Sequence, residues 1–218
     1  SYKPQQGCED AWWTQALEIE CALLQGEPLV GANIDLVKAF DKLPNELLLR
    51  LAEEVGVGKH ISNALRAMHR QLQRRFKLGP FAGAAFGSSN GILQGCPISV
   101  ILINLFAQVW VNTILAEAPG VSPRGYADDL AMTAARVRDL AQGVLLTHEY
   151  AEFTGMEVSS SKSNSWATTA TLRDALRREI GSLPVVQGDR YLGAHLSYSK
   201  KRRRTTLDTK LPECLRMC

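Results

Sequence analysis

Two adjacent aspartates, Asp128 and Asp129, lie between short apolar runs in the segment Tyr126 to Leu130. This pattern predicts two short strands joined by a tight turn. Adjacent residues of a straight strand point to opposite faces, so both carboxylates can serve one site only if they lie at or beside the turn. A third carboxylate, Asp35, ends another apolar, strand-like run upstream. The sequence therefore predicts a hairpin that brings acidic groups together.

Acidic groups gathered in one place repel one another unless a cation lies among them. The expected cation is Mg²⁺, which prefers oxygen ligands and keeps open positions for phosphates. That chemistry indicates phosphoryl transfer assisted by two metal ions. Each of these two motifs, taken alone, also has a purely structural interpretation. An aspartate that ends an apolar run is more often a turn or helix-cap residue, and an Asp-Asp pair is common in turns.

The size and composition predict one sizeable domain or a large fragment, with 218 residues of which 45% are hydrophobic. The most apolar run, 97–115, is interrupted by Ser99, Asn104, Gln108 and Asn112, which favours a buried helix over a membrane span. Five scattered cysteines form no CxxC pair, so free thiols are expected. The polar opening of the chain does not resemble a signal peptide.

Positive charge is concentrated in two places although the net charge is only +3. The segment Gly58 to Gly79 holds six Lys/Arg residues and no acid, and Lys200 to Arg204 are five consecutive cations. Such patches suit a phosphate backbone. The alternatives are a solvated helix face, a frayed tail or, for 200–204, a nuclear-import signal.

Hydrophobic periodicity and turn residues predict an α+β domain with helices on one face of an antiparallel sheet. Helices are expected over 10–25, 44–55, 60–73, 97–118, 137–154 and about 172–180, and strands over 29–35, 75–78, 84–92, 125–133, 163–168 and 185–196. In the helix 60–73, the expected core stripe is Ile61, Leu65, Met68 and Leu72. Arg66, Arg70 and Arg74 recur every four residues on a different face.

Two further segments carry groups that suit a nucleotide site. Phe40 follows Asp35 by five residues, where an aromatic ring could form the wall of a nucleotide pocket. In the segment 91–99, Gly91 and Gly95 allow the backbone to approach a ligand closely, and Gln94 can donate and accept hydrogen bonds. An ordinary loop entering a buried helix explains the same segment equally well.

Taken together and in this order, the motifs resemble the palm of a reverse transcriptase, and most closely those of non-long-terminal-repeat retrotransposons. The block at Asp35 resembles the first catalytic motif of the family, and 91–99 resembles its template-and-nucleotide loop. Tyr126 to Asp129 resembles the signature hairpin. The segment 155–157 with Lys162 resembles the fourth motif, and 191–193 resembles the primer-gripping hairpin. No single motif is decisive, whereas the ordered set is highly specific.

The resemblance implies a role for each matching residue. Asp35, Asp128 and Asp129 would hold two Mg²⁺ ions, for which Mn²⁺ could substitute, and Lys162 would neutralise or protonate departing pyrophosphate. Phe40 would reject a ribose 2′-hydroxyl. The nucleotide and template contacts would come from Leu36, Phe40, Gln94, Gly95 and Tyr126, and the primer grip from Tyr191, Leu192 and Gly193. Backbone contacts would come from Arg66, Arg70, Arg74, Lys200, Lys201 and Arg202. The implied partners are an RNA template, a DNA primer and dNTPs, with no membrane and no obvious protein partner.

The resemblance also predicts three parts: a remnant of the fingers over 1–28, a palm over 29–196 with a finger-side insertion at about 56–90, and the basic start of a thumb over 197–218. Val100 stands where many relatives carry a second Pro, and Ser159 to Ser161 stand where an Asn is frequent. With 34 residues before Asp35, most of the fingers of such a protein would be missing. We expect an intracellular location, nuclear if the source is a eukaryotic retrotransposon.

Three functional alternatives follow from these observations. The first is an active RNA-directed DNA polymerase domain. The second is a catalytically silent nucleic-acid-binding remnant, to which the basic patches point. The third is a related palm enzyme, either one that makes RNA or a reverse transcriptase of the group II intron type. The order Gln94 to Pro97 resembles retrotransposons more than intron enzymes.

Overall fold

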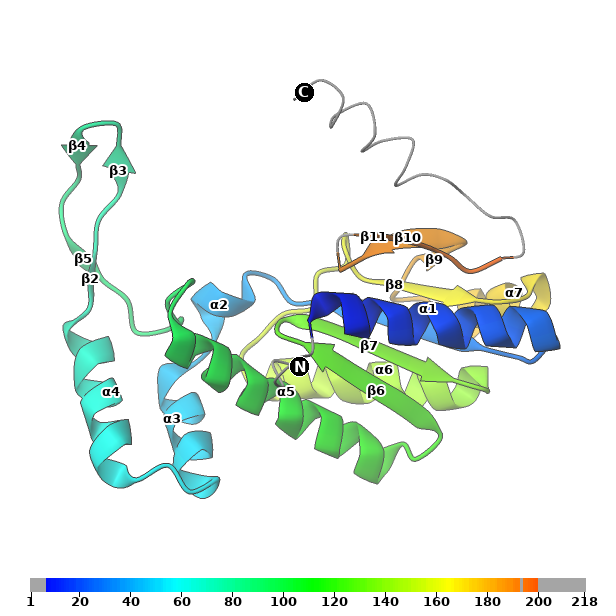
Figure 1. Ribbon diagram of the computed structural model, residues 1–218, viewed down its shortest axis with the longest axis horizontal. Coiled ribbons are helices and arrows are strands. Elements are labelled where there is room, and N and C mark those ends of the chain that lie inside the picture. The colour runs from blue at the N-terminus through cyan, green and yellow to red at the C-terminus, as the bar shows by residue number, and fades with distance from the viewer. Residues whose placement is uncertain (1–6, 193, 200–218) are drawn as a thin grey trace.

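A five-stranded sheet forms the centre of the protein in the computed structural model, which describes residues 7–192 and 194–199 (Figure 1). The strand order is β6 (Val121–Tyr126), β7 (Asp129–Ala134), β1 (Val30–Asp35), β8 (Asn164–Ala167) and β9 (Val185–Val186). Neighbours pair antiparallel except β8 and β9, which are parallel. The sheet is therefore the predicted antiparallel one along β6, β7, β1 and β8, with the parallel β9 added at its other edge. Pro123 lies on the edge strand β6. An edge strand has a neighbour on one side only, so it tolerates a residue that has no backbone N–H to donate.

The first face of the sheet carries the main hydrophobic core. Alternate residues of β1, namely Val30, Ala32 and Ile34, join Leu130 and Met132 of β7 on this face. Against it pack α3 (Asn45–Glu54), α5 (Pro97–Glu117), α6 (Val137–Phe153) and α7 (Ala170–Glu179), with the short α2 (Ala39–Lys42) at the end of β1. Burial of these alternate apolar side chains is the main favourable contribution to the free energy that holds the helices to the sheet.

The second face is also covered, which corrects the expectation of helices on one face. Its helix is α1 (Cys8–Gln25), and the hairpin of β10 (Gly188–Tyr191) and β11 (Ala194–Ser197) lies beside it. Glu18 of α1 lies 2.8 Å from a guanidinium nitrogen of Arg124 and accepts a 3.0 Å hydrogen bond from Thr133. The Trp166 ring stacks on Tyr198 with ring centroids 4.4 Å apart.

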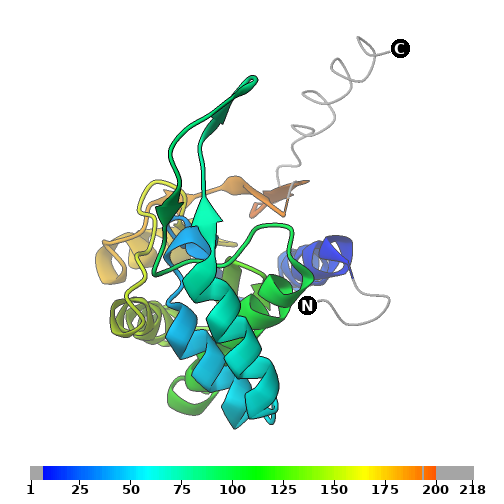
Figure 2. The same ribbon diagram turned by 90° about the vertical axis from the view of Figure 1, so that its left-hand side faces the viewer.

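A helix pair and a long hairpin extend beyond one end of the sheet (Figure 1). The helix α4 (Lys59–Gln71) packs on α3 and leads into the β-arm, residues 73–87, which contains four two-residue strands. These are β2 (Gln73–Arg74), β3 (Lys77–Leu78), β4 (Phe81–Ala82) and β5 (Phe86–Gly87). Figures 1 and 2 show the β-arm standing clear of the sheet and of the helices. The continuous strands expected over 75–78 and 84–92 are thus replaced by short, interrupted pairings.

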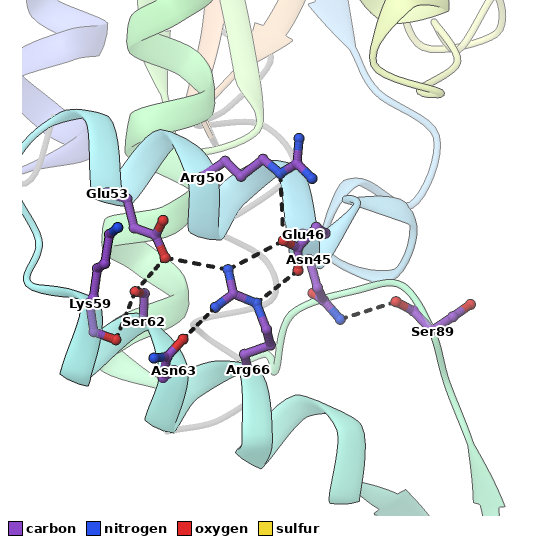
Figure 3. Close-up of polar contacts among 9 residues, drawn as sticks. All are labelled: Asn45, Glu46, Arg50, Glu53, Lys59, Ser62, Asn63, Arg66 and Ser89. Carbon is purple, nitrogen blue, oxygen red and sulfur yellow. Dashed lines mark hydrogen bonds and ion pairs between the residues drawn. The ribbon is translucent and has the colours of Figure 1, made fainter.

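The expected core stripe of α4 is confirmed at Leu65 and wrong at Ile61 and Met68. Ile61 and Met68 are 47% and 37% exposed, while Ser62, Leu65 and His69 are buried. The reason is a polar network between α3 and α4 (Figure 3). Arg66 donates to Glu46 at 2.9 and 3.2 Å and to Glu53 at 3.3 Å, and Ser62 donates to Glu53 at 2.6 Å. These bonds rotate the polar residues toward α3 and leave part of the apolar stripe outside.

The helix α5 is the one helix, among the residues that the structure describes, long and apolar enough to cross a membrane. One face of it, including Phe106, Trp110 and Ile114, is buried against the rest of the protein. Trp110 donates a 3.0 Å hydrogen bond to Thr147 of α6. The predicted helix is therefore observed and buries one face, while Ile101 and Leu115 on it are 58% and 52% exposed. The predicted division into fingers, palm and thumb stays a prediction.

Candidate functional site

Strand register brings two of the predicted acidic residues together. Asp35, the last residue of β1, pairs directly with Asp129, the first residue of β7. Ala127 adopts a left-handed conformation with φ of 54°, which allows a tight turn between Tyr126 and Asp129, themselves a paired couple. Asp128 lies in this turn. The predicted hairpin and its position beside Asp35 are therefore present in the fold.

The electrostatics of Asp129 reflect these neighbours. Burial first, and then the negative charges of Asp128 and Asp35, raise the pKa of Asp129 to about 6, while Lys162 acts in the opposite direction. The Lys162 ammonium lies 3.5 Å from a carboxylate oxygen of Asp35. Like charges are thus concentrated where β1 ends and β7 begins, and the cationic side chain of Lys162 lies next to them. Asp35, Asp128 and Asp129 are called the acidic edge below.

The segment 157–163 is hydrogen-bonded along the end of β1, which explains the position of Lys162. Ser159 donates its backbone N–H to the carbonyl of Asp35 at 2.8 Å, and Val37 donates to the carbonyl of Glu157 at 2.8 Å. The Ser163 hydroxyl accepts from the N–H of Asp35 at 3.0 Å. Sequence reasoning missed Ser163, and only its place at the start of the predicted strand 163–168 could have drawn attention to it.

A second backbone connection joins Phe40 to the loop that carries Gln94. Ile92 donates to the carbonyl of Phe40 at 2.7 Å, and Gly91 donates to the carbonyl of Leu43 at 2.8 Å. Gln94 and Gly95 lie further along this loop in an exposed turn, where Gly95 has φ of 85°. The half-buried Phe40 and the Gln94 turn therefore belong to one connected unit.

We expect the substitution Gly91→Ala to destabilise the protein by about 2 kcal/mol or more. Gly91 has φ of 89°, and a Cβ there would lie 2.6 Å from the backbone oxygen of Asp41, which no side-chain rotation can relieve. Urea unfolding measures the change. The matched control is Gly87→Ala, four residues earlier, where a Cβ meets no atom within 4 Å. Equal midpoints for both variants would contradict the close-approach argument.

A cavity of about 450 Å³ connects the acidic edge to the β10–β11 hairpin. Its lining includes Asp35, Asp129, Lys162, Tyr191 and Leu192. The Tyr191 hydroxyl is buried and makes no protein hydrogen bond. Burial, and then the charge of Asp129, raise the pKa of Tyr191 to about 12, so the hydroxyl is a neutral donor facing the acidic edge. Gly193, the third residue predicted for the primer grip, lies outside the described residues.

A buried polar chain, which sequence reasoning missed, fixes this hairpin to the sheet. Gln15 of α1 donates to Asn33 of β1 at 3.2 Å, and Asn33 donates to the Tyr198 hydroxyl at 3.0 Å. Asn164 of β8 donates to Asp189 of β10. Asn33 lies on the same face of β1 as Asp35, two residues away. The chain therefore sets the hairpin against the strand that carries the acidic residue.

The remaining predicted residues are placed as follows. Leu36 is buried in the core, so only its backbone can face a nucleotide, and Tyr126 is half-buried. Arg66 is held by Glu46 and Glu53, and Arg74 lies in β2 beyond the end of α4. The predicted row of three guanidiniums on one helix is therefore wrong, and of the three only Arg70 is an exposed residue of α4. Lys200, Lys201 and Arg202 lie outside the described residues.

The acidic edge has the oxygen ligands that Mg²⁺ requires, but not a finished cluster. Within 7–192 and 194–199, no three Asp, Glu, His or Cys side chains converge as a group that could hold a metal. Asp35 and Asp129 are nevertheless paired in register, and the pKa of Asp129 is raised first by burial and then by the charges of Asp128 and Asp35, a repulsion that a bound cation would relieve. The residues thus fit a hard cation that is coordinated partly by these carboxylates and partly by phosphate oxygens of a bound ligand.

A sheet with helices packed on it, an acidic turn at one end and a hairpin beside that turn define a polymerase palm. The family model described as reverse transcriptase (RNA-dependent DNA polymerase) matches residues 1–196. The chain therefore belongs to the reverse transcriptase family, as its motifs predicted.

Two curated relatives are proteins of transposable elements. The chain is 24% identical over 155 residues to the retrovirus-related Pol polyprotein from type-1 retrotransposable element R2 of Popillia japonica, a match that covers 67% of this chain and 26% of that protein. It is 23% identical over 148 residues to the transposon TX1 uncharacterized 149 kDa protein of Xenopus laevis, covering 64% and 11%. The match thus spans about a quarter or less of these relatives.

Solved telomerases share the fold. A telomerase from Candida albicans in complex with the TWJ fragment of telomeric RNA aligns with a TM-score of 0.64 at 13% identity, covering 97% of this chain and 39% of that chain. An apo telomerase from Candida tropicalis, truncated from its C-terminal domain, aligns with a TM-score of 0.62 at 14% identity, covering 86% and 38%. At this identity the likeness concerns the fold, and it confirms the predicted α+β palm.

Proposed function

We propose that this chain is the polymerase domain of a retroelement protein and adds dNTPs to a primer 3′-hydroxyl on an RNA template. The observation that carries the proposal is the cross-strand pair Asp35–Asp129, with Asp128 in the adjoining turn and Lys162 beside it. The family membership and the retrotransposon relatives support the same reaction class.

Each group has a role that its position allows. Asp35, Asp128 and Asp129 would hold two Mg²⁺ ions, which would neutralise the triphosphate and lower the pKa of the primer hydroxyl. Lys162, released from Asp35, would donate a charge-assisted hydrogen bond to the departing pyrophosphate. The Phe40 ring, on the unit that also carries Gln94, would lie under the sugar and favour dNTPs over rNTPs. Tyr191 and Leu192 would hold the primer end from across the cavity.

Primer extension on an RNA template tests the proposal. Both the 218-residue chain and any longer form encoded by its gene are assayed with Mg²⁺ or Mn²⁺, using dNTPs and rNTPs in parallel. We expect dNTP incorporation that the double substitution Asp128→Ala/Asp129→Ala abolishes. Equal incorporation by the unmodified protein and the double variant would sink the assignment of the acidic edge. Equal use of rNTPs would point instead to a palm enzyme that makes RNA.

The second candidate is a nucleic-acid-binding protein without catalysis. It is favoured by the observation that, among the described residues, no three metal-binding side chains converge as they stand. This candidate predicts salt-sensitive RNA binding and no incorporation by any form of the protein. Metal-dependent extension that requires Asp129 would exclude it.

A further inference from the structure

The β-arm, residues 73–87, exposes aromatic and aliphatic side chains that the proposed reaction does not use. Phe76, Leu78 and Phe81 are 77%, 84% and 76% exposed, and Leu78 and Phe81 are cross-strand partners at the tip. Phe76 and Phe86 stack on each other with ring centroids 5.0 Å apart. Contiguous exposed apolar surface of this kind marks an interaction site on a folded protein.

Local pairing gives the β-arm little stability of its own. Two ladders of two residues each hold it, supplemented by a 2.8 Å hydrogen bond from Gly83 to the carbonyl of Phe76 and one from the Arg75 guanidinium to Gly83 at 3.4 Å. An isolated two-stranded hairpin is marginally stable in water. A partner that covers the rings would therefore stabilise the β-arm as well as bind to it.

The charge of the β-arm identifies the class of partner. Arg74, Arg75 and Lys77 alternate with or adjoin the rings, and the β-arm contains no acid. The acid-free stretch is much longer, because the sequence has no Asp or Glu between Glu54 and Glu117. A surface that combines cations with exposed rings matches a single-stranded nucleic acid, whose phosphates meet the cations and whose unpaired bases stack on the rings.

We propose that the β-arm is a binding site for single-stranded nucleic acid, in which bases stack on Phe76 and Phe81 while Arg75 and Lys77 contact the phosphates. Every base has an aromatic face, so this binding is tolerant of sequence. A duplex conceals its base faces and keeps only the phosphate contacts. The inference shares with the proposed function only the assumption that nucleic acid is the partner, and it requires no nucleotide transfer.

Fluorescence anisotropy tests the site with the 218-residue chain and a short fluorescein-labelled oligouridylate, without divalent metal or dNTPs. We expect Phe76→Ala/Phe81→Ala to weaken binding by roughly tenfold or more, because each stacked base contributes substantially to affinity. The matched control is Phe153→Ala, which removes an 86% exposed ring at the end of α6, and we expect it to change nothing. An equal effect of both substitutions, or of neither, would overturn the proposal.

Two further measurements distinguish the loss of base stacking on the two rings from unfolding of the β-arm. Phe76→Trp/Phe81→Trp should retain or strengthen binding, because it restores aromatic faces at both positions. Arg75→Gln/Lys77→Gln should lower the dependence of log affinity on log salt concentration by about 0.7 for each phosphate that is no longer neutralised, whereas the alanine pair should leave that slope unchanged. Failure of the tryptophan pair to bind would overturn the stacking geometry.

A double-stranded RNA probe and photo-crosslinking complete the test. The alanine pair should not change binding of the duplex, and a 4-thiouridine probe should crosslink within 73–87. Crosslinks confined to other segments, with unchanged affinity in the alanine pair, would overturn the proposal. Because these measurements need no catalysis, a failure to extend primers does not affect them, and a failure of the β-arm to bind does not affect the assignment of the acidic edge.

Discussion

The substitution Asp129→Asn is expected to abolish nucleotide incorporation and, in metal-free buffer, to stabilise the fold at pH 8 but not at pH 4. Loss of activity should exceed about 100-fold, because even residues that only orient metal ligands contribute about 10- to 100-fold. The stabilisation follows from the pKa of Asp129, which burial and the charges of Asp128 and Asp35 raise from 3.8 to about 6.

The sign of the pH dependence follows from that rise. Below about pH 4 the carboxyl is protonated in both folded and unfolded chains, and the folded state suffers no penalty. As pH rises through about 6 the folded protein must ionise a poorly solvated group, and stability is lost. The full rise would correspond to about 3 kcal/mol, and partial exposure of the carboxylate reduces this to on the order of 1 kcal/mol.

Thermal unfolding at pH 4 and pH 8, in EDTA, measures the difference. The matched control is Asp174→Asn, an exposed carboxylate of α7 paired with Arg177. Added Mg²⁺ should then raise the melting temperature of the unmodified chain more than that of Asp129→Asn, because only a protein that binds the ion gains stability from it. A stability difference that is the same at both pH values, or undiminished primer extension, would contradict this account of Asp129.

The parts of the site that were predictable from sequence are those encoded by local pattern. Apolar runs on both sides of Asp128 and Asp129 predicted the hairpin, and a strand ending in Asp35 placed the third carboxylate at a sheet edge. Side-chain alternation along a strand and the need for a turn are properties of a few neighbouring residues, so the sequence reveals them directly. The helices were predictable for the same reason.

The errors and omissions involve contacts between distant segments. The buried face of α4 depends on Glu46 and Glu53 of another helix, and hydrophobic periodicity alone contains no information about those partners. Likewise, the Asn33–Tyr198 hydrogen bond joins residues far apart in sequence, and no local pattern marks either of them. The parallel pairing of β8 with β9 is also set by the crossing helix α7 rather than by the strands themselves.

The substitution Gly31→Ala should be the most destabilising single-methyl addition in the sheet, at about 3 kcal/mol. Gly31 pairs with Trp166 across β1 and β8, and a Cβ there would lie 2.3 Å from the nearest ring carbon. The ring is fully buried and stacked on Tyr198, so it cannot move aside without disturbing the second core. For a chain of this size the melting temperature should fall by about 6–12 °C.

A double-mutant cycle shows whether the clash is the cause. Trp166→Phe alone should destabilise the fold by leaving a void, but combined with Gly31→Ala it should cost less than the sum of the two, because the smaller ring makes room for the methyl group. Gly181→Ala is the control, since a Cβ there meets no atom within 4 Å. If the two changes in the free energy of unfolding were strictly additive, Trp166 would not be the residue that excludes a side chain at position 31.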